Sequence, residues 1–229
     1  MKKLLLLLLL GACSLPNLPP RQTVVDSRPP KDERLGTAWG ETLPSELDTA
    51  SGLRRTTGTP LEEIRLDYGS REPRGGLTLR SIPLQGGEVE LRVLSDDRSW
   101  PLVQEGDHYY VQGRAGRRYR LHYRNNGDRS YEIVASVDGL NVITGRAARR
   151  QDSGYVLRPR RELTIEGFRR DRQSVAAFTF SPPGDSYAAH SDYGSIANSG
   201  VIGTVIYELQ PPTPANSFPG DGFAPPPRR

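Results

Sequence analysis

Apolar side chains recur at every second position in a series of short runs between residues 61 and 209. A period of two indicates β-strands, because successive side chains of a strand point to opposite faces of the sheet. Glycine, proline, asparagine and aspartate separate the runs, and these residues favour turns. The pattern predicts an all-β domain, an antiparallel β-sandwich or jelly roll of about eight or nine strands. The runs lie at residues 77–79, 89–93, 119–123, 131–137, 140–143, 155–157, 163–165, 176–180 and 201–209.

Some of these runs support more specific expectations. Residues 119–123 alternate tyrosine and leucine with basic or ionisable side chains, and the turn sequence Asn125–Asp128 then leads into the alternating run 131–137. An Asn-Gly turn between two alternating runs favours a β-hairpin. A second turn is expected at Asp138-Gly139. The run 201–209 is apolar on both faces, which is typical of a central strand that is covered on both sides.

The two ends of the chain have no sustained apolar period. Residues 13–60 are polar and contain several prolines, and residues 210–229 contain seven prolines. Proline-rich chain without an apolar pattern is extended or disordered. We therefore expect a flexible tether over 13–60, a folded β domain over 61–209 and a disordered tail over 210–229. At the boundary, Thr59–Glu63 has the proline and early acids that begin a helix, which predicts one or two helical turns.

Overall composition agrees with this organisation. The 229 residues include 20 Pro and 24 Gly. Both residue types interrupt helix interiors, so a helical bundle is disfavoured.

The first residues have the form of a targeting signal. Two lysines precede seven consecutive leucines, Leu4–Leu10, and Gly11 and Ala12 follow. Residues 1–12 thus match a secretory signal peptide. Seven leucines rise only about 10 Å as a helix, which is too short to cross an apolar bilayer core about 30 Å thick.

The sequence Leu10-Gly11-Ala12-Cys13 resembles the lipobox of bacterial lipoproteins at every position. The resemblance implies that the signal peptide is cut before Cys13, that the thiol is diacylated and that the new amino terminus is acylated, with chains such as palmitate. Cys13 is the only cysteine, so no intrachain disulfide can form. Acyl chains contribute about 0.8 kcal/mol per buried CH₂, so two or three of them hold a protein to a membrane.

The residue after the cysteine bears on location. An Asp there resembles the inner-membrane retention signal of Gram-negative lipoproteins, and this chain has Ser14 instead. We therefore expect an exported protein, lipid-anchored to the bacterial cell envelope at the outer membrane and facing the periplasm.

Net charge argues against nucleic acid as a partner. Of 31 basic residues, Lys2 and Lys3 leave with the signal peptide, so 29 remain against 27 acidic ones. Nucleic-acid binding relies on a clear excess of positive charge, and export separates the chain from nucleic acid. The expected partners are the membrane, through the lipid anchor, and an envelope polymer or envelope protein.

The C-terminal half is similar to a group of uncharacterised bacterial β proteins. The resemblance implies a recurring domain and supplies no reaction. It rests on five ordered segments, residues 137–143, 154–157, 165–168, 186–189 and 200–203.

Candidate catalytic groups are present by residue type, but their sequence context does not set them apart. Ser186, His190 and Asp192 are close in sequence, whereas a nucleophilic triad needs groups that converge in space. The three histidines are too widely separated for a zinc pattern. We therefore predict a non-enzymatic protein without metal or cofactor. The alternative is an envelope glycan hydrolase that uses paired carboxylates. Its candidate carboxylates are Glu132, Asp138, Glu162 and Glu166.

The candidate binding face is the row Arg118, Arg120, His122 and Arg124. Alternate residues of a strand point the same way, about 6.6 to 6.8 Å apart, so the row could bind an anionic polymer or an acidic partner. A solvated strand face paired with acids on neighbouring strands explains the same residues.

Aromatic residues leave a similar choice open. Trp100, Tyr109 and Tyr110 could form a platform for stacking sugars, or they could belong to a buried core. Taken with the signal sequence, these features predict a lipid-anchored binding or envelope-assembly module.

Overall fold

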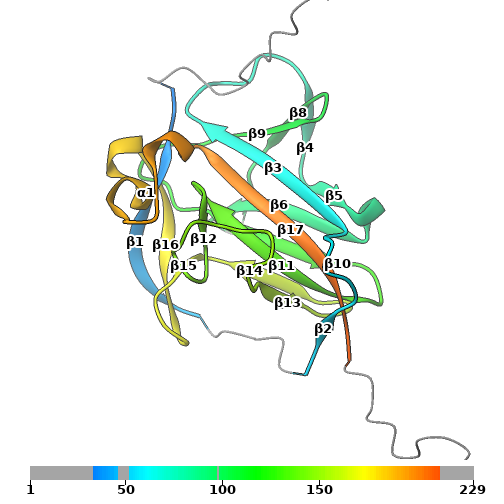
Figure 1. Ribbon diagram of the computed structural model, residues 1–229. Coiled ribbons are helices and arrows are strands. Elements are labelled where there is room, and N and C mark those ends of the chain that lie inside the picture. The colour runs from blue at the N-terminus through cyan, green and yellow to red at the C-terminus, as the bar shows by residue number, and fades with distance from the viewer. Residues whose placement is uncertain (1–32, 46–51, 97, 212–229) are drawn as a thin grey trace, which may run out of the picture.

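The computed structural model describes residues 33–45, 52–96 and 98–211, and these residues are mostly β. Their strands form two large sheets that face each other and a small sheet at one end (Figure 1). One short helix, α1 (Tyr187–His190), lies beside the small sheet. The strands are β1 (Gly36–Pro44), β2 (Arg54–Arg55), β3 (Glu62–Gly69), β4 (Leu77–Leu79), β5 (Ile82–Leu84), β6 (Val89–Ser95), β7 (Arg98–Ser99), β8 (Leu102–Glu105), β9 (His108–Gln112), β10 (Arg120–Asn125), β11 (Ser130–Val137), β12 (Leu140–Asn141), β13 (Tyr155–Leu157), β14 (Glu162–Ile165), β15 (Gly167–Arg169), β16 (Ser174–Ser181) and β17 (Val201–Gln210).

The main sheet has the strand order β12-β11-β17-β3-β9-β8-β4, with β13 also paired to β11 and β2 to β17. Its pairs are antiparallel except for β3 and β9, which run parallel. The sheet is therefore mixed, and the expectation of a purely antiparallel architecture is wrong at this pair. β17 lies between β11 and β3 and is largely buried on both faces, which confirms that the last run is a central strand. Val134, Val205 and Tyr207 form a separate apolar cluster.

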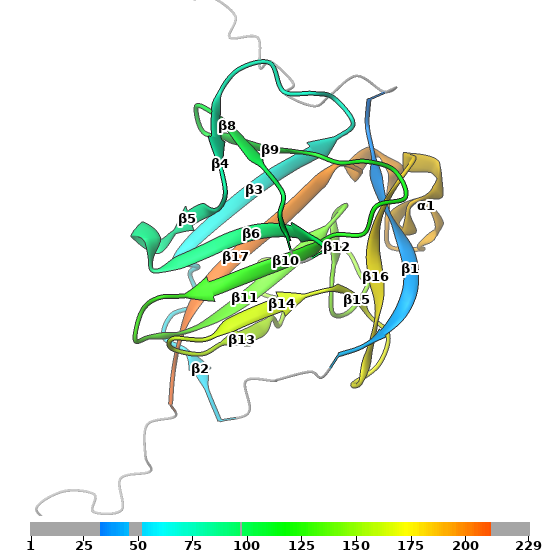
Figure 2. The same ribbon diagram turned by 180° about the vertical axis from the view of Figure 1, so that it is seen from behind.

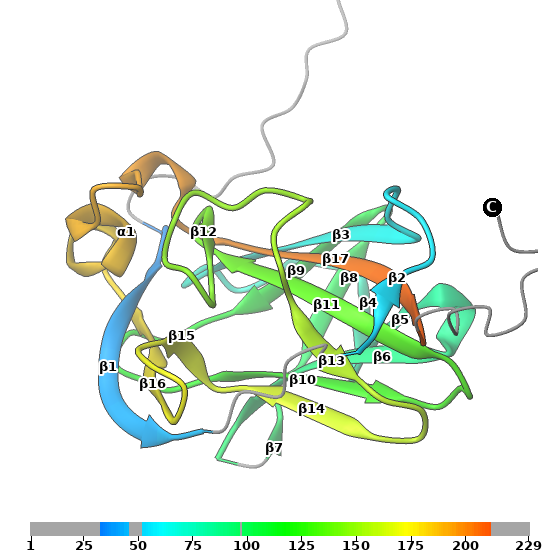
Figure 3. The ribbon, with the colours of Figure 1, turned by 60° about the horizontal axis from the view of Figure 1, so that its bottom comes forward.

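The second sheet has the order β14-β10-β6-β5, with β7 paired to β6, and all of its pairs are antiparallel. Figure 3 shows it as a layer below the main sheet, and Figure 2 brings β6, β10 and β14 forward. Its alternating apolar side chains, such as Leu91 and Leu121, are fully buried between the sheets. The Tyr123 hydroxyl lies 2.7 Å from Thr204 Oγ1 on β17, so a hydrogen bond also joins the two layers.

A small end sheet, β1-β16-β15, closes one end of the two layers (Figure 3). Phe178 and Phe180 on β16 stack on Tyr119, with ring centroids 5.3 and 4.3 Å away. Because Tyr119 directly precedes β10, these rings join the end sheet to the second sheet. The corner between these two sheets is where the candidate site lies.

The hairpin expected around Asn125–Asp128 does not form. β10 pairs with β6 and β14, whereas β11 pairs with β12, β13 and β17. The turn instead carries the chain from the second sheet to the main sheet. The side chain of Asn125 holds this crossing, because its Nδ2 donates to the carbonyls of Arg129 and Arg158 at 2.7 and 3.0 Å. β11 is buried on both faces, so it belongs in the centre of the larger sheet.

The turn expected at Asp138-Gly139 is confirmed. Val137 and Leu140 are register partners, and Asp138 and Gly139 have φ of 52° and 78°. Two positive φ angles are typical of the two-residue hairpin loop, for which Asp-Gly is a preferred sequence.

The predicted tether over 13–60 is wrong for its described part. Residues 36–44 form β1, which pairs with β16, and β2 pairs with β17. A bulge between Trp39 and Thr42 interrupts the pairing of β1, so its sequence does not show the period of two. The helix expected at Thr59–Glu63 is also absent from the described residues, since β3 begins at Glu62. The signal peptide, Cys13 and the tail from residue 212 lie outside the described residues.

Candidate anion-binding cleft

The predicted row of basic residues lies on the outer face of the second sheet. Arg118 directly precedes Tyr119, and Arg120, His122 and Arg124 belong to β10. The three apolar side chains that alternate with them are buried, so the expected alternation is confirmed.

Acidic side chains flank the far end of the row. Arg124 stands in register between Glu90 on β6 and Glu162 on β14, and its Nε is 3.9 Å from Glu162. His122 Nδ1 lies 3.1 Å from Thr164 Oγ1. Burial lowers the pKa of His122 and outweighs the attraction of Glu162, so the imidazole is neutral at neutral pH. This end of the row therefore carries little excess positive charge.

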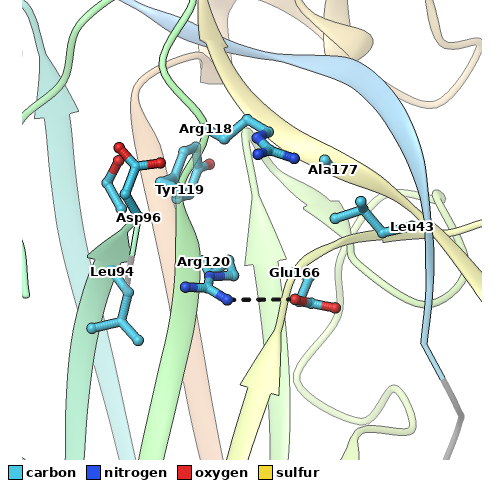
Figure 4. A pocket seen from close by; sticks show the side chains of 9 residues that line it. Leu43, Leu94, Asp96, Arg118, Tyr119, Arg120, Glu166 and Ala177 are labelled. Carbon is cyan, nitrogen blue, oxygen red and sulfur yellow. Dashed lines mark ion pairs between the residues drawn. The ribbon is translucent and has the colours of Figure 1, made fainter. Parts of the chain in front are cut away.

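At the other end of the row, Arg118 and Arg120 line a cavity of about 390 Å³. Figure 4 shows that its walls come from both the second sheet and the end sheet. Arg120 faces Glu166 across a gap of 3.7 Å, and Arg118 pairs with Glu41 on β1. The remaining lining residues are Leu43, Leu94, Ser95, Asp96, Tyr119 and Ala177.

A second cavity, of about 680 Å³, adjoins the first, because Ser95 and Asp96 line both. Arg98 on β7 lines it, together with Arg114 and Arg117 from the loop between β9 and β10. Two segments that are separate in sequence, β7 and residues 114–120, thus bring arginines to one corner of the fold. We call the two cavities together the arginine cleft, lined by Arg98, Arg114, Arg117, Arg118 and Arg120.

Positive charge exceeds negative charge in the arginine cleft. Its described lining holds five arginines and two acids, Asp96 and Glu166. Arg117 pairs with Asp96. Arg98 and Arg114 are exposed, and the described residues give neither of them an ion-pair partner. Exposed ion pairs contribute only about 0 to 1 kcal/mol, so an incoming anion can compete with the acids already present.

Of the three aromatic residues considered for sugar stacking, Trp100 lines the arginine cleft. It is half-buried, and its ring meets Phe180 edge-on with centroids 5.6 Å apart. Tyr109 and Tyr110 lie on β9 in the main sheet. Tyr110 is buried, its hydroxyl donates to the carbonyl of Arg71 at 2.8 Å, and burial raises its pKa to about 12. These two tyrosines therefore help to pack β9 against its surroundings in the fold. They form no stacking platform with Trp100.

The four candidate carboxylates are dispersed over the fold. Glu132 on β11 accepts hydrogen bonds from Arg55 Nε and from the Gly154 N–H, both at 2.7 Å, and so fastens neighbouring segments to the main sheet. Glu162 faces His122 and Arg124. Only Glu166 of the four lines the arginine cleft.

Asp138, the fourth, is a buried structural carboxylate. Its oxygens accept from the Thr37 N–H at 2.7 Å, the Tyr68 hydroxyl at 2.6 Å and the Gly200 N–H at 2.9 Å. Burial raises the pKa of Asp138 to about 6, although these hydrogen bonds act in the opposite direction. The carboxylate therefore joins β1, β3 and the start of β17 to the end of β11.

Ser186, His190 and Asp192 do not form a triad. Ser186 is fully buried at the start of α1, where its Oγ accepts from the Ala189 N–H at 3.2 Å and donates to the Pro183 carbonyl at 2.7 Å. His190 and Asp192 are exposed. Within the described ranges no group of three or more His, Cys, Asp or Glu side chains is placed to hold a metal ion.

Sequence reasoning missed Arg98, Arg114 and Arg117. Periodicity identifies strand faces, and these arginines lie on a two-residue strand and in a loop. A local signal was nevertheless present, because residues 113–118 hold three arginines and two glycines. Only the fold shows that this loop lies beside β7.

No helix in the described part of the chain is long and apolar enough to span a membrane. Comparison with known protein families, curated proteins and solved structures gives no match.

Proposed function

We propose that this chain is a lipoprotein of the bacterial cell envelope, anchored to the outer membrane through acylated Cys13, and that its β domain binds an anionic envelope component without catalysing a reaction. The anchor is supported by the lipobox-like sequence Leu10-Gly11-Ala12-Cys13. The binding role is supported by the arginine cleft.

One observation carries the binding proposal: five arginines from two separate segments meet around adjoining cavities. A guanidinium group is always charged at physiological pH and offers a planar fork of donors to a carboxylate or phosphate. Long side chains of like charge repel one another, so their convergence favours an anionic partner over a merely solvated surface. Within the predicted row, Arg118 and Arg120 line the cleft and would contact this partner. Arg124 lies at the other end of the row, beside Glu162, and would contribute less to binding.

A hydrolase is the second candidate, because Asp96 and Glu166 line the same cavity. A glycosidase needs one carboxyl group that holds a proton for the leaving group. Here each acid already faces an arginine, Arg117 or Arg120, and five arginines outnumber the two acids in the lining of the arginine cleft. We therefore favour binding. Release of soluble sugar fragments from isolated cell walls, abolished by Glu166→Gln, would reverse this choice.

Cosedimentation with isolated envelope material tests the binding proposal. We expect the chain from residue 13, with Cys13→Ser to prevent acylation, to pellet with cell-wall polymer and to be released as salt rises, because exposed charges are screened within about 10 Å at 0.1 M. Arg118→Gln/Arg120→Gln should reduce the bound fraction.

The matched control is Arg150→Gln/Arg160→Gln, which removes the same charge from two exposed ion pairs elsewhere. Equal binding by both double variants, or binding that does not respond to salt, would contradict the proposal.

Mass spectrometry of the mature amino terminus tests the anchor. The expected product begins at Cys13 and carries acyl chains, and Cys13→Ala should abolish their addition. An unmodified Cys13 would overturn the lipoprotein assignment.

A further inference from the structure

We propose that the larger cavity of the arginine cleft is a subsite for an acidic pyranose, a sugar ring that carries a carboxylate or a phosphate. The ring stacks on Trp100, and its anionic group is held by Arg98 and Arg114. This inference rests on the proposed function and names the ligand class for the same site.

Trp100 is suited to stacking because it is held firmly while part of it stays accessible. The backbone N–H of Trp100 donates to the Val93 carbonyl at 2.7 Å, which fixes the backbone directly after β7. Its ring meets Phe180 at an interplanar angle of 81°. In such an edge-to-face contact Phe180 covers at most one face of the indole, and the half-buried side chain lines the cavity. A tryptophan offers a large apolar surface for little loss of side-chain entropy.

Arg98 and Arg114 are suited to the anionic group because they are uncommitted. Both line the same cavity as Trp100, and the described residues offer them no acid within ion-pair distance. Arg117 in that cavity is occupied by Asp96. Two guanidinium forks beside an aromatic ring match a ligand with an apolar ring and a bidentate acceptor. Ser95 and Ser99 also line the cavity and add hydroxyl groups.

The size and setting of the cavity fit one unit of a polymer. Its volume of about 680 Å³ falls within the range of about 300 to 1,000 Å³ that is typical of small-ligand sites. The cavity opens beside the smaller one, which shares Ser95 and Asp96 with it and presents Arg118 and Arg120. A neighbouring acidic sugar can therefore occupy the smaller cavity, as a repeating anionic glycan requires.

Tryptophan fluorescence gives a direct test, because the chain has only two tryptophans, Trp39 and Trp100. Trp39→Phe leaves Trp100 as the single reporter. The probes are tri-galacturonate for a carboxylate sugar and glucose 1-phosphate for a phosphate sugar. Maltotriose is the neutral sugar control, and inorganic phosphate is the anion control.

We expect at least one acidic sugar to change the Trp100 emission saturably and to bind at least about tenfold more tightly than both controls, because a charge-assisted hydrogen bond contributes enough to change affinity about tenfold. Arg98→Gln/Arg114→Gln in the Trp39→Phe background should weaken that binding by about tenfold or more. Arg150→Gln/Arg160→Gln should leave it unchanged.

Three results would overturn the inference: no response to either acidic sugar, equal affinity for maltotriose, or equal affinity for inorganic phosphate. The cosedimentation experiment separates these failures from failure of the proposed function. If envelope binding is lost in Arg118→Gln/Arg120→Gln but the Trp100 probe gives no response, the arginine cleft binds an anion and the sugar subsite is wrong.

Discussion

Asp138 makes the stability of the fold depend on pH in a direction opposite to that of most carboxylates. The side chain is buried and accepts hydrogen bonds from Thr37, Tyr68 and Gly200. Burial raises its pKa from 3.8 to about 6. Between these two values the folded protein keeps a proton that the unfolded chain has already released. Folding stability must therefore fall as pH rises from about 4 to about 6.

The size of the effect follows from the gap of about 2 pH units between the two pKa values. Each unit corresponds to 1.36 kcal/mol, so this carboxyl group should cost about 3 kcal/mol of stability between pH 3.5 and pH 7.5. Asp138→Asn preserves the shape and removes the titration. The asparagine amide places an N–H donor beside the Thr37 N–H donor. The resulting loss of folding stability does not vary with pH.

Urea unfolding at several pH values measures the effect, with the Asp138→Asn chain as reference so that all other titrations cancel. The free energy of unfolding of the wild type, minus that of the variant, should fall by about 3 kcal/mol from pH 3.5 to pH 7.5. A difference that is flat, or that rises with pH, would show that the hydrogen-bond donors outweigh burial and would refute the reasoning.

Three further predictions concern the architecture. Tyr123→Phe should lower the free energy of unfolding in urea by about 1 to 3 kcal/mol, because it leaves the Thr204 hydroxyl unpaired between the sheets. Adding Thr204→Val should recover part of this loss, and a further loss would contradict the pairing. Gly167→Ala should lower the melting temperature by several degrees, since a Cβ there would lie 1.9 Å from the Ala176 carbonyl oxygen. Gly184→Ala should change the melting temperature little, because a Cβ there would meet nothing within 4 Å. Equal effects of the two substitutions would be inconsistent with the β15–β16 packing. A chain that begins at residue 46 lacks β1 and the Thr37 contacts to Tyr68 and Asp138. It should melt at least about 10 °C below a chain that begins at residue 33, which corresponds to a loss of about 3 kcal/mol or more in a domain of this size. Melting temperatures within a few degrees of each other would show that β1 is dispensable.

Side-chain alternation gave the faces of the strands but not their partners. Tyr119, Leu121 and Tyr123 are buried as the period of two predicts. The choice between a hairpin and a crossing at Asn125–Asp128 depends on which strands cover β11, and that is decided by contacts between residues far apart in sequence. β1 escaped prediction because its bulge breaks the period.

The candidate site shows the same limit. Arg118 and Arg120 could be selected from the sequence because they belong to a run in which basic and apolar residues alternate. The smaller contribution of Arg124 could not be predicted, because the acid that pairs with it, Glu162, comes from β14. Arg98 and Arg114 lie outside any regular pattern, and the fold alone places them with Trp100.

Hydrogen–deuterium exchange of the mature chain, with and without saturating isolated cell-wall polymer, tests the location of binding most directly. We predict slower exchange in residues 93–101 and 113–120, the segments that carry most of the arginine cleft. We predict no change around α1, where exposed Tyr193 and Ile196 lie. Protection confined to the α1 end, with residues 93–101 and 113–120 exchanging as in the free protein, would contradict the assignment of the arginine cleft as the binding site.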